Sequence, residues 1–149
     1  MSKATVLITG AGIGIGHCSA LAFAAAGYHV YVTDVLDKEG GDTVGAIEAA
    51  GGTAEFHLLD VTDTANVDAV VKLAESATGA LDAVIANAGI AHKVLLDEMS
   101  DEKWAHTLDV DLTGVFRVCR AASPAMPAHR QQAATPRRPD LVHPPGVSP

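Results

Sequence analysis

The fold is decided by the stretch Thr9-Gly10-Ala11-Gly12-Ile13-Gly14-Ile15-Gly16, which directly follows the apolar run 5–8. That run predicts a buried strand, and the amphipathic residues 14–26 predict a helix. The glycines between them allow a tight turn and a close approach of the backbone to a ligand. A helix that begins in such a turn presents free N–H groups and positive potential, so the stretch predicts a phosphate-binding turn.

Short apolar runs and amphipathic stretches alternate along the chain as far as residue 126. Further strands are expected at 28–33, 54–59 and 81–86, and the intervening helices are expected to stop at Gly27 and Gly51. This alternation is typical of parallel strands joined by crossover helices. The sequence therefore predicts an α/β fold of the Rossmann type, a doubly wound parallel sheet with strand order 3-2-1-4 that is incomplete beyond the fourth strand.

Two apolar stripes at helical spacing indicate how the later helices pack. Val67, Val70, Val71 and Ala74 follow an expected cap at Thr62 or Asp63 and predict a helix that faces a sheet or another helix. A second stripe follows an expected cap at Ser100 and predicts packing in the core or in a dimer. Its members are Trp104, Leu108, Leu112, Val115 and Phe116.

An acidic residue ends the second expected strand. Asp34 lies 18 positions after Gly16 (34 minus 16). A carboxylate there can accept hydrogen bonds from the ribose hydroxyls of adenosine, and it would repel a 2′-phosphate. The sequence thus predicts NAD as the cofactor. The alternative, a glycine-rich turn beside an unrelated surface Asp, is weaker because the strand and helix context is satisfied.

Four motifs, taken in order, resemble those of the short-chain dehydrogenase/reductase family. The turn from Thr9 to Gly16 is similar to the family's Thr-Gly-x-x-x-Gly-x-Gly motif, and Asp60-Val61-Thr62 to the Asp-Val after its third strand. Ala86-Asn87-Ala88-Gly89 resembles its Asn-Asn-Ala-Gly, and the segment 109–116 resembles a segment with Asn followed by Leu-x-Gly-x-Phe. The resemblance covers residues 3–126.

The resemblance implies an oxidoreductase that transfers hydride between NAD and a small-molecule alcohol or carbonyl substrate. It implies that Asp60 meets the adenine amino group, that Val61 lies beside the adenine ring and that Asn87 lies beside the cofactor. Residues Ile15 and His17, where NADP-using relatives often carry Lys or Arg, also suit NAD. The expected cofactor-binding residues are Thr9, Gly10, Gly12, Ile13, Gly14, Gly16, Asp34, Asp60, Val61, Asn87, Ala88 and Gly89.

The sequence departs from the family at the catalytic residues. Asp111 replaces the Asn that helps to hold a proton-relay water, so it is our single catalytic candidate, with a solvated polar residue as the equal alternative. The family also uses a Ser, a Tyr and a Lys four residues after the Tyr. The tyrosines here, Tyr28 and Tyr31, have Val32 and Val35 at that spacing. We expect little or no activity of this chain alone, and a non-catalytic NAD-binding fragment is the alternative function.

The composition changes after residue 126. Six of the seven prolines lie from Pro127 to Pro149, and proline interrupts both helices and strands. We therefore expect a partial Rossmann domain at 1–126 and a disordered tail at 127–149. The tail is consistent with a reading-frame change or a truncation, because the codons of 137–143 can encode Gly-Gly-Arg-Ile-Ser-Ser-Ile one nucleotide later. The alternative is a short family member with its own tail.

Bulk properties limit the partners and the compartment. The net charge of -8 argues against a nucleic-acid or membrane surface, and no apolar run is long enough to span a bilayer. Cys18 and Cys119 are far apart and the seven histidines are scattered, so we expect a reduced, cytoplasmic protein without a metal site. A homo-oligomer is expected for the family and is in doubt for this chain alone.

Overall fold

The computed structural model describes residues 3–126, and within them four parallel strands form one sheet. The strands are β1 (Thr5–Thr9), β2 (His29–Asp34), β3 (Thr53–Leu58) and β4 (Ala83–Ile85). Their order is β3-β2-β1-β4, so the predicted α/β fold and the order 3-2-1-4 are confirmed. The predicted tail at 127–149 lies outside the described residues.

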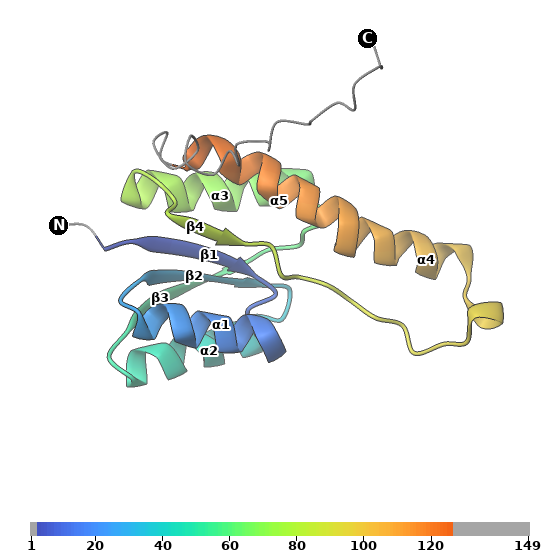
Figure 1. Cartoon of the computed structure of the whole chain (residues 1–149), viewed down its shortest axis with the longest axis horizontal. Helices are drawn as coiled ribbons and strands as arrows, with labels where there is room; N and C mark the ends of the chain where they lie inside the picture. The colour runs from blue at the N-terminus through green and yellow to red at the C-terminus, as the bar shows by residue number, and fades with distance from the viewer. Residues whose placement is uncertain (1–2, 127–149) are drawn as a thin grey trace, which may run out of the picture.

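Helices cover both faces of the sheet (Figure 1). Helices α1 (Gly14–Ala25) and α2 (Asp37–Ala49) lie on one face, and α3 (Thr64–Thr78) lies on the other beside a long helical run. This run consists of α4 (Asp101–Leu108), the π-helical turn η2 (Asp109–Gly114) and α5 (Val115–Ala122). Short 3-10 turns, η1 (Leu96–Glu98) and η3 (Ser123–Ala125), precede and follow it.

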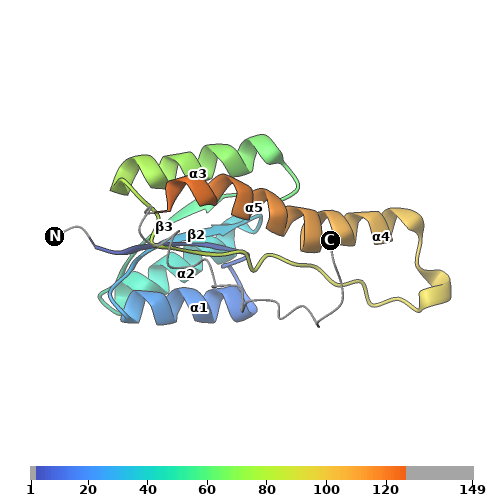
Figure 2. The same ribbon diagram turned by 45° about the horizontal axis from the view of Figure 1, so that its top comes forward.

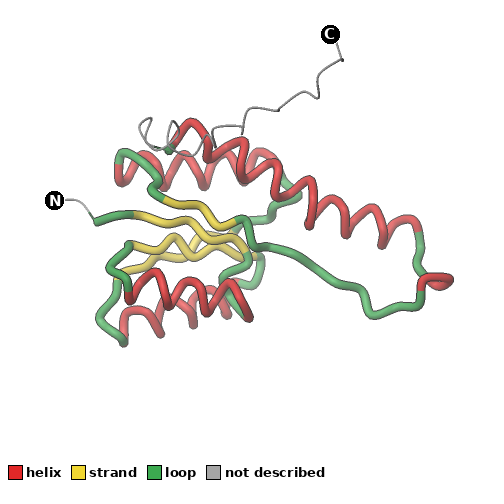
Figure 3. Tube along the Cα trace, in the orientation of Figure 1, coloured by secondary structure: helices red, strands yellow, loops and turns green. Residues whose placement is uncertain are grey.

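The long helical run extends past the sheet. In Figures 1 and 2, α4 and the loop before it project beyond the carboxyl ends of the strands, and Figure 3 shows this loop as an irregular connection from β4. Parallel sheets bind ligands at the carboxyl ends of their strands. The projecting segment therefore forms one side of the region where a site is expected.

Alternate residues of the strands enter two separate cores. Val6, Ile8, Val30 and Val32 are completely buried against α1 and α2, while Leu7 and Tyr31 pack with α3 and α5 on the opposite face. Because side chains alternate along a strand, a strand buried on both faces is apolar throughout. This double burial explains the continuous apolar runs that identify β1 and β2 in the sequence.

Of the two caps expected for helix α3, Thr62 and Asp63, the structure uses Asp63. The Asp63 carboxylate accepts hydrogen bonds from the backbone N–H groups of Ala65 (2.9 Å) and Asn66 (3.1 Å), which otherwise lack partners in the first turn. The helix ends at Gly79, whose φ of 83° is left-handed. Its predicted apolar stripe is buried, as expected, at Val67, Val70, Val71 and Ala74.

The second apolar stripe does not pack into a core. Trp104, Leu112 and Phe116 are 55%, 64% and 59% exposed, so packing in the core is wrong for these side chains, whereas packing in a dimer stays a prediction. The reason is geometric, because α4 projects past the sheet and α5 buries only Val118 and Ala122 in the core beside α3. Strand β4 is also shorter than predicted and forms one edge of the sheet within residues 3–126.

Candidate cofactor site

The glycine-rich turn joins β1 to α1 by a close contact with the β4 loop. Gly10 has a left-handed φ of 64°, and a Cβ there would lie 2.8 Å from the Ala88 Cα. A Cβ at Gly16 would collide with the Gly10 carbonyl oxygen and come within 2.6 Å of the Asn87 amide nitrogen. The turn can take this shape only with glycine at both positions.

Thr9 and Asn87 hold the turn against the end of β4. The Asn87 side-chain amide donates to the carbonyl oxygens of Thr9 (3.0 Å) and Gly10 (3.1 Å). In return, the Thr9 hydroxyl oxygen accepts from the backbone N–H groups of Asn87 and Ala88, each at 3.1 Å. Two strand ends far apart in sequence are therefore fixed as one surface.

Asp34 links the glycine-rich turn to the end of β2. Its Oδ2 accepts a hydrogen bond from the Gly12 N–H at 2.8 Å, and its Oδ1 accepts one from the Leu36 N–H at 3.0 Å. The residue is only 7% exposed, yet it lines a cavity. Each carboxylate oxygen can accept more than one hydrogen bond, so Asp34 retains acceptor capacity toward the cavity.

The loop after β3 carries Asp60 and Val61. Asp60 Oδ1 accepts hydrogen bonds from the Thr62 backbone N–H (2.8 Å) and hydroxyl (2.7 Å), which fixes the direction of the carboxylate. Val61 is 5% exposed and packs beneath the π-helical turn, where Gly114 leaves room for it. This loop forms a wall of the same cavity.

Asp111 lies in the π-helical turn and reaches the loop after β4. Its Oδ1 accepts a hydrogen bond from the Ile90 N–H at 2.8 Å, and it lies 3.4 Å from the position that a Cβ on Gly89 would occupy. Asp111 does not itself line the cavity, whereas Gly89 and Ile90 do. The single catalytic candidate from the sequence is thus an exposed residue that contacts the backbone of the cavity wall without lining the cavity.

These segments enclose one cavity of about 680 Å³ at the carboxyl ends of all four strands. Of the predicted cofactor residues, Thr9, Gly12, Gly14 and Gly16 support the turn behind the cavity. The others line it: Gly10, Ile13, Asp34, Asp60, Val61, Asn87, Ala88 and Gly89.

Several lining residues were not predicted as site residues. Ile15, Val35, Leu36, Leu59 and Ile90 each lie within two positions of a predicted residue, so their sequence positions gave a usable signal. His106 and Val110 come from the distant α4 and η2. Their spacing of four residues puts them on one helical face, but only the tertiary structure turns that face toward the cavity.

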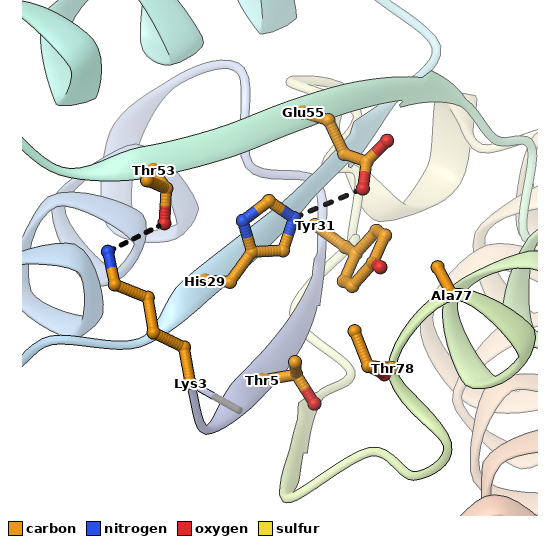
Figure 4. A pocket seen from close by; sticks show the side chains of 8 residues that line it. All are labelled: Lys3, Thr5, His29, Tyr31, Thr53, Glu55, Ala77 and Thr78. Atoms are coloured by element: carbon orange, nitrogen blue, oxygen red, sulfur yellow. Dashed lines mark hydrogen bonds and ion pairs between the residues drawn. The ribbon is translucent and has the colours of Figure 1, made fainter. Parts of the chain in front are cut away.

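A second cavity of about 550 Å³ lies at the amino ends of β1, β2 and β3, away from the first (Figure 4). In it the Glu55 carboxylate lies 3.1 Å from His29 Nε2, and its other oxygen lies 3.2 Å from His57 Nε2. Burial, and then the nearby Glu55, raises the pKa of Tyr31 to about 12. The Tyr31 phenol is therefore protonated at neutral pH and lies outside the first cavity.

Neither cavity contains a metal-binding cluster. Among residues 3–126, no group of three or more His, Cys, Asp or Glu side chains is placed to hold a metal ion. Cys18 and Cys119 are both free and exposed. In the same part of the chain, no helix combines the length and the apolar character that crossing a membrane would require.

Comparison with known proteins identifies the family. A family model described as short chain dehydrogenase matches residues 4–134. The chain belongs to this family. The chain is 41% identical over 119 residues to 3beta-hydroxysteroid dehydrogenase 1 of Eggerthella lenta, covering 79% of this chain and 46% of that protein.

Two further similarities agree with this assignment. The chain is 38% identical over 121 residues to a hexahydro-indene-carboxyl-CoA reductase of Mycobacterium tuberculosis, covering 80% of this chain and 46% of the reductase. The crystal structure of a hydroxysteroid dehydrogenase from Escherichia coli superposes with a TM-score of 0.78 at 28% identity, covering 84% of this chain and 53% of that one. The chain thus spans about half the length of the curated relatives it matches.

Proposed function

We propose that this short-chain dehydrogenase binds NAD, and that the whole protein transfers hydride between NAD and a small-molecule alcohol or carbonyl compound. The observation that carries the proposal is the position of Asp34. Its carboxylate is nearly buried at the end of β2, is tied to the glycine-rich turn, and faces a cavity of about 680 Å³. Family membership supports a nicotinamide cofactor in this place.

The residues of the cavity fit a dinucleotide. The α1 N-terminus has no side-chain cap, so its free N–H groups suit a pyrophosphate, and the glycine turn leaves space that a Cβ would fill. Asp34 would hold the ribose of adenosine, and Asp60 and Val61 would hold the adenine. Asn87, Ala88 and Gly89 would lie at the nicotinamide end. When bound, NAD would supply the hydride acceptor.

The preference for NAD over NADP follows from charge. A 2′-phosphate beside Asp34 would place two negative groups together in a nearly buried position, where their repulsion is poorly screened. The neighbouring Val35 is 58% exposed and offers no cation to offset it. A ribose hydroxyl, in contrast, can donate a hydrogen bond to the carboxylate.

These 149 residues lack the Tyr and the Lys four positions later that the family uses for acid–base chemistry. Neither Tyr28 nor Tyr31 has a Lys four residues later, and Tyr31 lies in the other cavity. Asp111 contacts the Ile90 N–H, so it could orient the loop at the nicotinamide end or hold a water there. This observation favours the second candidate function, in which the chain by itself binds NAD without catalysing hydride transfer.

The cysteine content supports a reducing compartment for the proposed enzyme. Cys18 and Cys119 are the only cysteines in the sequence, and both are exposed thiols without a disulfide partner. Exposed free thiols are typical of proteins in reducing surroundings. We therefore propose the cytoplasm as the site of action.

Cofactor selectivity tests the proposal. The wild-type chain should bind NAD at least about tenfold more tightly than NADP, which corresponds to about 1.4 kcal/mol. Asp34→Asn keeps an oxygen acceptor for one backbone N–H and removes the charge, so it should reduce this ratio. Val35→Arg, combined with either Asp34→Asn or Asp34→Ala, should reverse the NAD/NADP affinity ratio because a cation then faces the 2′-phosphate.

Isothermal titration calorimetry with NAD and NADP would measure these affinities. Asp60→Asn is the matched control, because it removes a carboxylate from the same cavity at the adenine end and should leave the NAD/NADP ratio unchanged. Tighter binding of NADP than of NAD by the wild-type chain would overturn the proposed selectivity. No binding of either dinucleotide would overturn the proposed function.

A further inference from the structure

Arg117 lies on α5, and its guanidinium contacts the loop after β3 and the π-helical turn η2. Its Nη1 donates to the carbonyl oxygens of Val61 (3.2 Å) and Asp109 (3.3 Å), and its Nη2 lies 2.8 Å from Asp109 Oδ1. The side chain is only 16% exposed. One mostly buried cation thus contacts both the loop after β3, 56 positions earlier in the sequence, and the π-helical turn η2.

The loop that accepts the hydrogen bond from Arg117, at residues 60 and 61, forms a wall of the proposed adenine site. Val61 lines the cavity and lies directly under η2, where a Cβ on Gly114 would come 2.7 Å from Val61 Cγ2. Val110, also in η2, is buried and lines the same cavity. The contact with Arg117 is therefore made immediately behind the surface that would meet the adenine ring.

The chemistry of the contact suits a rigid support. A buried carbonyl oxygen needs a donor, and a guanidinium can serve several acceptors at fixed angles. The Asp109 carboxylate offsets the positive charge of Arg117 and orients its guanidinium, as expected of charge-assisted hydrogen bonds. Without the guanidinium, the Val61 carbonyl would lose this donor, and the loop would be held against η2 by side-chain packing alone.

We infer that Arg117 is a positioning residue for the adenine end of the cofactor site, acting through Asp109 and the backbone of Val61. The inference rests on the proposed NAD function. Arg117 itself does not contact the cofactor. It keeps the Asp60–Val61 loop in the conformation that receives adenine, so the loss of Arg117 should selectively weaken the binding of ligands that contain adenine.

Arg120 provides a matched control on the same helix. Its Nη2 lies 3.6 Å from Asp68 Oδ1 on α3, and its guanidinium lies 5.5 Å from the centre of the Phe116 ring. It is 44% exposed and does not line the cavity. Arg120→Gln therefore removes one arginine and one ion pair from α5 without touching the adenine wall.

The test compares Arg117→Gln with Arg120→Gln in the 149-residue chain. Calorimetric titration with NADH, 5′-AMP and nicotinamide mononucleotide gives three dissociation constants for each variant. For Arg117→Gln we expect those for NADH and 5′-AMP to rise about tenfold, in line with loss of a charge-assisted contact. The constant for nicotinamide mononucleotide, which lacks adenine, should change by less than about twofold, as should all three in Arg120→Gln.

Hydrogen exchange in the ligand-free chain gives a second readout. Amides of residues 60–62 should exchange faster in Arg117→Gln and not in Arg120→Gln. Equal losses for 5′-AMP and nicotinamide mononucleotide, or unchanged binding, would overturn the inference. If Arg117→Gln does not fold, Arg117→Lys and Asp109→Asn carry the same comparison. If the wild-type chain and the Arg117 variants bind NADH and 5′-AMP equally well, only the role of Arg117 is refuted. If the wild-type chain binds neither ligand, both the proposed function and the role of Arg117 are refuted.

Discussion

The Glu55 carboxylate lies between two histidines at the amino end of the sheet. Burial alone would raise its pKa, but the hydrogen bonds and charges of His29 and His57 outweigh burial and hold the pKa below its ordinary value. A carboxylate whose pKa is lowered by folding stabilises the folded state when it is ionised. This contribution is complete above the unfolded pKa and is lost as the pH falls through the folded pKa.

The pH dependence of unfolding tests this assignment for Glu55. We expect Glu55→Gln to unfold at lower urea concentration than the wild type at pH 6, with a difference that shrinks as the pH falls below about 4.5. The exposed Glu48→Gln on α2 is the control and should track the wild type throughout. A difference between Glu55→Gln and wild type that stays constant from pH 6 to pH 3 would contradict the assignment.

Asn87 shows how a single residue can be identified correctly and still be understood only in part from sequence. Its place in Ala86-Asn87-Ala88-Gly89 predicts a cofactor residue, and it does line the cavity. Its side-chain amide, however, donates to the carbonyl oxygens of Thr9 and Gly10. The amide therefore shapes the glycine-rich turn, a role that depends on two strand ends that meet only in the folded chain.

At the scale of elements, the helical run from α4 to α5 is the least enclosed part of the fold. Its stripe of Trp104, Leu112 and Phe116 is more than half exposed, although the spacing alone is that of a buried helix. Periodicity reports that a helix has an apolar face, but not whether a neighbouring element covers it. Contiguous exposed apolar side chains favour association between chains.

Replacing part of this stripe should reduce self-association. We expect Leu112→Gln combined with Phe116→Gln to lower the association constant of the chain at least about tenfold, because apolar surface is removed from the contact. The unfolding free energy should change by about 0.5 kcal/mol or less, since both side chains are mostly exposed. Sedimentation velocity over a concentration series would measure the association.

Leu73→Gln is the control for this stripe. Leu73 is 44% exposed on α3 and lies outside the α4–α5 stripe, so its replacement should leave association unchanged. Equal self-association of the wild type and the double variant at every concentration would contradict the assignment of this face.

At the scale of the whole molecule, we expect the 149-residue chain to bind NADH without catalysing hydride transfer at a rate typical of its family. Carbonyl reduction needs a proton donor at the substrate oxygen, and general acid–base assistance is worth roughly 100- to 10,000-fold. Asp111 is tied to the Ile90 N–H and does not line the cavity, and Tyr31 is protonated in the other cavity.

NADH absorbance, followed with a panel of ketones and secondary alcohols, would test this expectation. The hydroxysteroid dehydrogenase of Escherichia coli serves as the positive control, and calorimetry establishes that NADH is bound under the same conditions. Turnover comparable to that of the control enzyme would refute the prediction. His106 would then be the first residue to replace, because it lines the cavity and its ring can donate and accept a proton.

The sequence by itself determined the strand–turn–helix unit around Gly10, the positions of the strands and the Asp63 cap of α3. These features are local or depend on alternation along the chain, because glycine conformation, strand burial and helix capping act over a few residues. The strand order and the Asp60, Val61 and Asn87 positions in the cavity were expected from the resemblance to a known family. The tertiary structure alone decided that His106 and Val110 face the cavity, that Arg117 reaches Val61, and that the α4–α5 stripe stays exposed. Such contacts join segments distant in sequence, and their existence depends on how the helices dock on the sheet, which no periodicity specifies.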